Sequence, residues 1–287
     1  MPDVPLMPQP FIIDMHAHLV WNDKPSAGYL QLLYGNVGKD AYEEMVERYR
    51  EPAAYIELLR ESGVSHSIIL AEHSPLTTGY SWNRDVEDFC AGHPELIPFC
   101  TVNPHLDPDP VQTVTELCAN HGFRGIKLYP TYNHFYMNEA VLYPVYEAAQ
   151  AMGVPVVFHT GLSVFHNARI KYGNPLDVDD LAMDFPGLAL IMAHGGRSAW
   201  YMEAMAMARL HKNVYIDISG IPGRKLLQHF PEAERFSHKF LFGTDWPEVP
   251  LGDSIVKLQS LGLSGSALQN ILGMNAARIL GIGPEFL

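Results

Sequence analysis

Eight short apolar runs alternate with segments of helical patterning along the 287-residue chain, and this alternation restricts the fold more than any other feature. The runs are rich in Val, Ile, Leu and Phe, and their apolar residues are nearly continuous. Such runs are typical of strands buried on both faces, as in a parallel sheet covered by helices. The predicted strands are residues 11–18, 65–71, 96–102, 123–129, 154–159, 188–194, 213–219 and 238–243.

Apolar residues at helical spacing predict the elements between these strands. The predicted helices are residues 39–62, 82–92, 109–121, 138–152 and 198–211, followed by two short helices within 264–280. Eight strands alternating with helices favour a (β/α)8 TIM barrel, which is an α/β fold, as a single domain over residues 1–287. A doubly wound open sheet is the alternative, but the glycines do not form GxGxxG after the first strand.

Two segments depart from the repeating pattern. Residues 19–64 are longer than one crossover requires, and residues 21–38 have little periodicity. We therefore predict an insertion at the rim of the barrel, with residues 21–38 forming a loop that contributes to the pocket. Residues 264–287 are predicted to form a C-terminal helical tail.

Composition and charge limit the classes of partner. Hydrophobic residues make up 47% of the chain, charged residues 18%, and the net charge is −13. This charge argues against nucleic acid or an anionic membrane surface as the main partner, although an anionic small-molecule substrate remains compatible. No signal peptide, membrane span or CxxC motif is evident, so we expect a cytoplasmic protein. A homodimer is the expectation for a typical enzyme.

Residues able to bind a metal stand at the ends of several predicted strands. They are His16 and His18 in FIIDMHAH, His159 in VPVVFH, His194 in LALIMAH and Asp245 in KFLFGTD. The C-terminal ends of barrel strands meet at one face, so these side chains are expected to converge there. An isolated HxH pair would more simply be two core histidines, but the other strand-end residues favour a metal site. Asp245 could alternatively cap a helix.

Other polar residues occupy related positions. Asp14 precedes the HxH pair and is expected to support the metal site from one layer deeper. Glu72, Asn103 and Ser219 close the second, third and seventh predicted strands, and are candidates for pocket-facing groups.

The motifs DMHAH, GIKLYP, FHTG, AHGGR and FGTDWP, in this order, resemble the amidohydrolase superfamily, and the layout is similar to its amidohydrolase-2 branch. The resemblance implies a distorted barrel with a catalytic divalent metal at the strand ends. It implies that His16, His18, His159 and Asp245 ligate the first ion, and that His194 is either catalytic or a ligand of a second ion. The nitrogen-rich ligand set favours one or two Zn²⁺ ions, with Mn²⁺ as the alternative.

Lys127, in RGIKLYP, bears on the type of chemistry. The branch contains hydrolases and non-oxidative decarboxylases. In binuclear members of the superfamily a lysine on the fourth strand is carboxylated and bridges two metals, whereas decarboxylases of the branch generally lack it. Lys127 is therefore either a carboxylated metal ligand, a plain cation that binds a substrate carboxylate, or a side chain that extends to the rim.

The first functional hypothesis is a metal-dependent hydrolase of a small carbonyl substrate, namely a lactone, amide or ester, that uses a metal-activated water with Asp245 and His194 as catalytic groups. The alternative is a metal-dependent non-oxidative decarboxylase of an aromatic or related carboxylic acid. A degenerate barrel kept only for binding is disfavoured by the intact ligand set. Arg197 is a candidate clamp for a substrate carboxylate, and Tyr129 and Trp246 are candidates to line the pocket, with surface exposure and rim packing as the respective alternatives.

Overall fold

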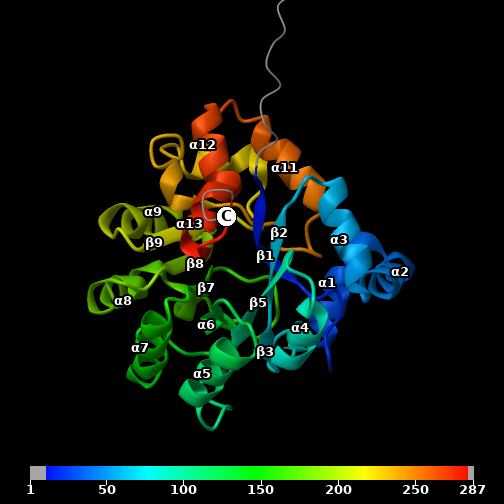
Figure 1. Cartoon of the computed structure of the whole chain (residues 1–287), viewed down its shortest axis with the longest axis horizontal. Helices are drawn as coiled ribbons and strands as arrows, with labels where there is room; N and C mark the ends of the chain where they lie inside the picture. Colours follow the sequence, from blue (N-terminus) through cyan, green and yellow to red (C-terminus); the bar gives the residue numbers. More distant parts are fainter. Residues whose placement is uncertain (1–10, 284–287) are drawn as a thin grey trace, which may run out of the picture.

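In the computed structural model, which describes residues 11–283, eight parallel strands form one sheet in their order along the chain (Figure 1). Backbone hydrogen bonds join its two ends, from Met15 N to Phe242 O at 2.9 Å and from His18 N to Trp246 O at 2.8 Å, so the barrel is nearly closed. The TIM-barrel prediction is confirmed. The strands are β1 (Ile13–His18), β2 (His66–Leu70), β5 (Leu96–Thr101), β6 (Ile126–Leu128), β7 (Val156–Gly161), β8 (Leu190–Arg197), β9 (Val214–Asp217) and β10 (Phe240–Leu241).

The helices lie around the barrel, and several boundaries differ from the predictions. They are α1 (Ala27–Val37), α2 (Lys39–Tyr49), α3 (Pro52–Glu61), α4 (Asn83–Cys90), α5 (Pro110–Asn120), α6 (Pro130–Asn133), α7 (Tyr143–Met152), α8 (Val178–Asp184), α9 (Tyr201–Leu210), α10 (Leu226–His229), α11 (Leu251–Gln259), α12 (Gly265–Gln269) and α13 (Asn275–Leu280). Among the described residues no helix is both long and apolar enough to cross a membrane.

The rim insertion is helical where a loop was predicted. α1 occupies residues 27–37 and begins after Ser26, whose hydroxyl oxygen accepts a hydrogen bond from Tyr29 N at 3.1 Å. The single helix predicted over residues 39–62 is wrong, because Pro52 starts a new helix. Proline has no N–H to donate and pushes the preceding residue, Glu51, to extended backbone, which separates α2 from α3.

A hairpin follows β2 and was not predicted. Its strands β3 (Glu72–Ser74) and β4 (Gly79–Ser81) pair antiparallel. The hairpin also pairs with the start of the rim insertion, where Asp23 and Tyr80 exchange backbone hydrogen bonds of 2.7 and 3.0 Å. This pairing holds the segment that follows β1 against the hairpin that follows β2.

The interior of the barrel is apolar at its N-terminal end. Alternate residues of the strands, among them Ile13, Ile68, Ile97 and Val157, form one buried cluster with Ala276, Ala277 and Leu280 of α13. α13, drawn in red in Figure 1, covers this end. The larger apolar cluster lies between the strands and the surrounding helices. Polar groups inside the barrel are therefore confined to its other end.

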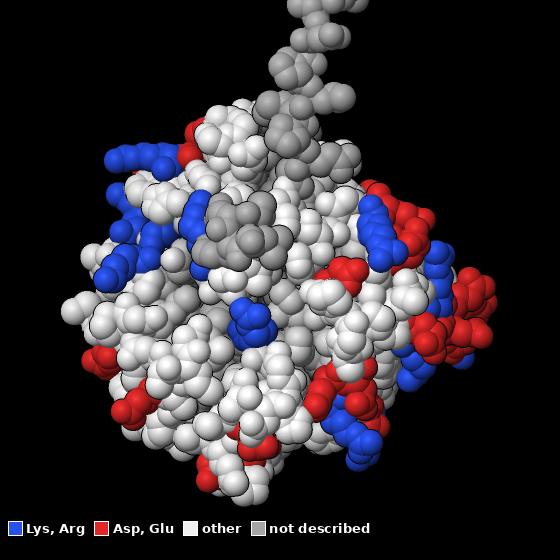
Figure 2. Space-filling model, in the orientation of Figure 1, with Lys and Arg blue, Asp and Glu red and all other residues white. Residues whose placement is uncertain are grey.

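Most charged side chains lie toward the periphery of the face shown in Figure 2, although one basic side chain lies near its middle. On α2 and α3 they alternate in sign and form exposed ion pairs, such as Lys39 with Glu43 at 3.6 Å and Arg60 with Glu57 at 3.5 Å. Such pairs contribute little to stability because both partners are well solvated.

Candidate metal centre

The strand-end residues converge around Asp245. One ligand atom each from His16, His194 and Asp245 lies within 4.8 Å of the others, and all three residues are buried. Asp245 Oδ1 is 3.3 Å from His16 Nε2 and 3.6 Å from His18 Nε2, and Asp245 Oδ2 is 3.8 Å from His194 Nδ1. The His159 ring is centred 4.6 Å from that of His194. The structure thus brings together all five residues that the sequence singled out.

An unpartnered nitrogen and the chemistry of the donor set both fit a bound cation. His159 Nε2 is buried and has no hydrogen-bond partner among the described residues, which is costly unless another group pairs with it. Imidazole nitrogens and a carboxylate oxygen are donors that Zn²⁺ and related divalent ions accept. The residues present therefore fit the metal implied by the sequence.

The backbone is strained at two of these residues. His194 has a φ of 63° and Asp245 a φ of 71°, both in the left-handed region. A non-glycine residue held there costs about 1–3 kcal/mol and persists only when the surroundings enforce it. In both cases the strained residue places a polar side chain toward the cluster, so the fold gives up stability to build this geometry.

Lys127 is fully buried in the same cluster. Its Nζ lies 3.3 Å from His16 Nε2 and 5.2 Å from the ring centre of Tyr129. Burial lowers the pKa of Lys127 to about 8, although the nearby carboxylates of Asp217 and Asp245 act in the opposite direction. The side chain does not extend to the rim.

The end of β9 contributes two groups below the histidines. Asp217 Oδ2 accepts a hydrogen bond from His16 Nδ1 at 2.5 Å, and the backbone oxygen of Ser219 accepts one from His194 Nδ1 at 3.0 Å. Asp217 was missed from the sequence. It lies within the predicted strand 213–219, two residues before Ser219, so strand alternation places it on the same face as Ser219 and could have identified it.

Asp14 supports the segment that carries Asp245. Its carboxylate accepts hydrogen bonds from Thr244 N at 2.9 Å, Thr244 Oγ1 at 2.7 Å and His16 N at 3.1 Å. Because one side chain holds both ends of the barrel closure, it fixes the two ligand-bearing segments relative to each other, as predicted for a supporting residue.

A narrow cavity opens onto the cluster. Its lining includes Tyr129 and Arg197, which were predicted to contact substrate, together with Glu72 and Thr78 of the hairpin and Tyr29 of α1. The predicted contribution of the rim insertion is therefore present. The remaining lining residues are His16, His18, Asn22, Lys127, Tyr132, His159, Phe165, His194, Asp245, Pro247 and Glu248.

Two candidates lie away from this cavity. Trp246 follows Asp245, but its ring packs against Tyr49 and Tyr55, with ring centres 5.3 and 5.8 Å apart. The prediction that Trp246 lines the pocket is not borne out by its placement, because the chain turns at Asp245 and directs the next side chain into the packing around the barrel. Asn103 is also directed elsewhere, since its amide donates to His73 O at 3.2 Å.

Arg197 reaches the cluster from β8. Its Nη1 is 3.8 Å from Asp245 Oδ2, and the side chain is 21% exposed. It is therefore neither a free surface arginine nor fully engaged by Asp245. A guanidinium in this position can also bind a carboxylate that enters the cavity.

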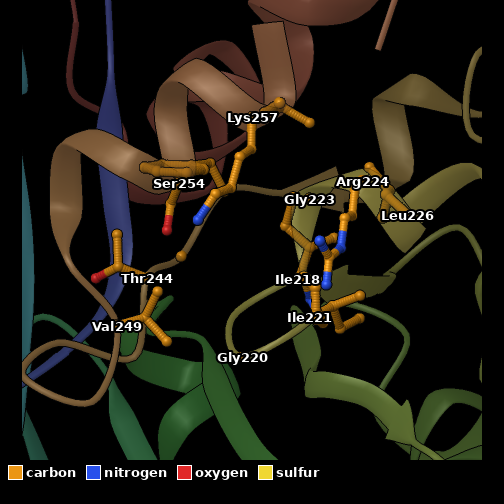
Figure 3. A pocket seen from close by; sticks show the side chains of 14 residues that line it. Ile218, Gly220, Ile221, Gly223, Arg224, Leu226, Thr244, Val249, Ser254 and Lys257 are labelled. Atoms are coloured by element: carbon orange, nitrogen blue, oxygen red, sulfur yellow. The ribbon is translucent and has the colours of Figure 1, made fainter. Parts of the chain in front are cut away.

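A second cavity, of about 300 Å³, lies on the other side of the loop that carries Asp245 (Figure 3). Only backbone separates it from the cluster at Gly220 and Gly243. A Cβ at Gly220 would lie 2.3 Å from Arg197 Nη1, and one at Gly243 would lie 2.4 Å from Asp217 Oδ1. These two positions require glycine because the chain passes directly against the polar cluster.

Comparison with known proteins places the chain in a family. A probable 2-pyrone-4,6-dicarboxylic acid hydrolase from Acinetobacter baumannii, with citric acid bound, is 17% identical with a TM-score of 0.65, covering 94% of this chain and 99% of that one. A 5-carboxyvanillate decarboxylase from Novosphingobium aromaticivorans, complexed with manganese, is 15% identical with a TM-score of 0.71, covering 95% and 96%. An uncharacterised TIM-barrel protein from Bordetella bronchiseptica is 23% identical with a TM-score of 0.77, covering 94% and 98%.

These likenesses show a shared fold over the full length of each structure. No curated protein sequence matches the chain. The amidohydrolase family model matches residues 13–282, which include every residue of the cluster described above. The chain therefore belongs to the amidohydrolase family, as its strand-end motifs had indicated.

Proposed function

We propose that this protein is a metal-dependent hydrolase that uses an activated water to open a small carbonyl substrate, namely a lactone, amide or ester. The observation that carries this proposal is the position of Lys127, whose buried amine lies 3.3 Å from His16 Nε2 at the centre of the candidate ligand set. The resemblance to the superfamily associates a lysine at this place with hydrolases, and its absence with decarboxylases.

The chain's own residues would hold the ion. His16, His18, His159 and Asp245 are proposed as ligands, with His194 as either a ligand of a second ion or the group that faces the substrate. When bound, a divalent ion supplies Lewis acidity, which makes water more acidic and polarises a carbonyl group. The nitrogen-rich set favours Zn²⁺, and the manganese in the decarboxylase of similar fold supports testing Mn²⁺ as well.

Asp245 is proposed as the group that accepts a proton from water. Burial alone would raise the pKa of Asp245, but His194, His16 and His18 together lower it well below its usual value. The carboxylate is therefore ionised near neutral pH, which is the form that a base requires. Burial lowers the pKa of His194 well below its usual value.

Lys127 is proposed to add its neutral amine to CO₂, which forms an N–C bond and releases one proton, and the resulting carbamate could serve as a metal ligand. This reaction requires the unprotonated amine, and burial, which lowers the pKa of Lys127 to about 8, increases the fraction in that form near neutral pH. A free ammonium that binds a substrate carboxylate is the alternative role for this residue.

The lining of the cavity supports a compact substrate with a ring and a carboxylate. Tyr29, Tyr129, Tyr132 and Phe165 provide aromatic surface, and Arg197 provides a cation. A hydrolase of similar fold is named for 2-pyrone-4,6-dicarboxylic acid, which supports including cyclic carboxylated esters among the compounds tested.

Decarboxylation of an aromatic acid is the second candidate. Arg197 favours it, because a guanidinium 3.8 Å from Asp245 could hold the carboxylate that leaves. The two reactions share the same ligand set and differ in what they consume and release.

One experiment separates the two candidates. The purified protein, loaded with Zn²⁺ or Mn²⁺, is incubated with a panel of cyclic esters, amides and aromatic acids, while its intact mass reports the state of Lys127. The proposal expects products heavier than substrate by one water, and a Lys127 heavier by CO₂. Release of CO₂ from an aromatic acid, with Lys127 unmodified, would contradict it.

A further inference from the structure

We propose that Asp217 and Ser219, at the end of β9, are positioning residues that determine which ring nitrogen of His16 and of His194 carries the proton. Each ring would then keep its lone pair on Nε2, and in His16 this nitrogen faces Asp245 and Lys127. This inference rests on the ion-binding part of the proposed function and is independent of the reaction that follows.

The first line of evidence is the contact between His16 and Asp217. His16 Nδ1 is 2.5 Å from Asp217 Oδ2, and the two side chains are 1% and 0% exposed. A carboxylate oxygen accepts hydrogen bonds, so the hydrogen must be on His16 Nδ1. The opposite nitrogen, Nε2, is then left with a lone pair.

That lone pair has an environment that suits a cation. His16 Nε2 lies 3.3 Å from Asp245 Oδ1 and 3.3 Å from Lys127 Nζ. Two acceptors as close as Nε2 and Oδ1 repel each other unless a positive charge lies against both. With the proton of His16 held on the Asp217 side, that charge must come from Lys127 or from a bound ion.

His194 is fixed by a different acceptor from the same segment. Its Nδ1 is 3.0 Å from the backbone oxygen of Ser219 and 3.1 Å from Ser219 Oγ. A carbonyl oxygen can only accept, so the hydrogen again lies on Nδ1 and the lone pair on Nε2. Two histidines from β1 and β8 therefore receive the same tautomer from the end of β9.

Hydrogen bonds within the segment hold these acceptors in place. Ser219 N donates to Asp217 Oδ1 at 2.8 Å, and Ser219 Oγ donates to Asp217 Oδ2 at 2.9 Å. One carboxylate thus orients both the turn and the His16 ring. Gly243 leaves room for it, since a Cβ there would lie 2.4 Å from Asp217 Oδ1.

His18 lacks comparable support, because its Nδ1 is buried without a hydrogen-bond partner within the described part of the chain. The contrast assigns β9 a specific task, which is to preset half of the histidine ligands before an ion arrives. Partners of this kind typically contribute about 10–100-fold to metal affinity because they orient the ring and select its tautomer.

The first test measures the tautomers directly, in wild-type protein labelled with ¹⁵N-histidine. Long-range ¹H–¹⁵N spectra distinguish a hydrogen on Nδ1 from one on Nε2, and the variants His16→Gln and His194→Gln assign the signals. We expect both rings to carry the hydrogen on Nδ1, with and without Zn²⁺. A hydrogen on Nε2 of His16 in the ion-free protein would overturn the inference.

The second test measures Zn²⁺ affinity by competition with a chromophoric chelator. Asp217→Asn keeps the size of the side chain but adds an N–H donor that favours the wrong tautomer, so we expect about 10–100-fold weaker binding. Asp253→Asn, the same change on the exposed face of α11, should leave affinity unchanged. Affinity of Asp217→Asn within twofold of wild type would also overturn the inference. Neither test uses a substrate, so a decarboxylase would give the same results as a hydrolase.

Discussion

The two ends of this barrel are built from the same strands but have opposite chemistry. At the N-terminal end, residues such as Ile13, Ile97 and Val157 pack beneath α13. Two positions after Val157, β7 presents His159, which joins the polar cluster at the other end. One end of the strands therefore serves stability and the other serves chemistry, and each can be perturbed separately.

The largest expected effect is on turnover, from a change at the polar end. Asp245→Asn removes the proposed proton acceptor while keeping its size, so turnover should fall by about 10²–10⁴-fold. The rate is measured with whichever substrate the panel identifies. Asp253→Asn provides a matched control. Full activity of Asp245→Asn would refute its role as a base, even if metal content were normal.

A change at the apolar end should lower stability and leave metal binding intact. Phe99→Ala removes a fully buried ring and should lower the free energy of unfolding by about 3–5 kcal/mol, measured by denaturant titration. Zn²⁺ affinity of the folded variant should stay within about twofold, because the ring lies below the cluster. A large loss of affinity would mean that the two ends are coupled and that the comparison fails.

A smaller effect is expected from a change at Trp246, which distinguishes a packing role from a substrate-binding role. Trp246→Phe should lower the free energy of unfolding by about 0.5–3 kcal/mol, because the indole packs on Tyr49 and Tyr55. The KM should be unchanged within about twofold. If instead KM rose several-fold at unchanged stability, the original prediction of a substrate contact would be restored.

The smallest expected effect is on the pH dependence of stability. It comes from Asp177, whose half-buried carboxyl group belongs to neither end of the barrel. Burial raises the pKa of Asp177 to about 6, so the folded protein binds its proton more tightly than the unfolded chain. Stability should therefore fall as pH rises from about 4 to about 6, by less than about 1 kcal/mol because solvent screens the group. Asp177→Asn should remove this part of the pH dependence in thermal unfolding curves. An unchanged profile would contradict the assignment.

The sequence predicted the strands well because fully buried strands leave a continuous apolar pattern. It also predicted that the candidate metal-binding side chains converge at one end of the barrel, because polar residues end the apolar pattern at equivalent positions in several strands. The rim was predicted poorly. The helix α1 and the hairpin of residues 72–81 owe their conformation to contacts with each other, such as the pairing of Asp23 with Tyr80, and local periodicity does not encode such contacts.

The directions of individual side chains could also not be predicted from the sequence. Positive φ angles at His194 and Asp245 redirect the chain, and β1 has a register irregularity between Asp14 and Ala17. Counting residues along an ideal strand therefore fails at these places. This is why Trp246 was expected in the pocket but packs in the core, and why Asp217, which contacts His16 at 2.5 Å, was missed.

The polar end of the barrel is proposed to hold a divalent metal ion. The most direct test is elemental analysis of wild-type protein that has been loaded with Zn²⁺ and then dialysed extensively, compared with folded His159→Ala treated in the same way. We expect at least one retained ion per wild-type chain and a clear loss in the variant. Folded wild-type protein that retains essentially no ion would contradict it.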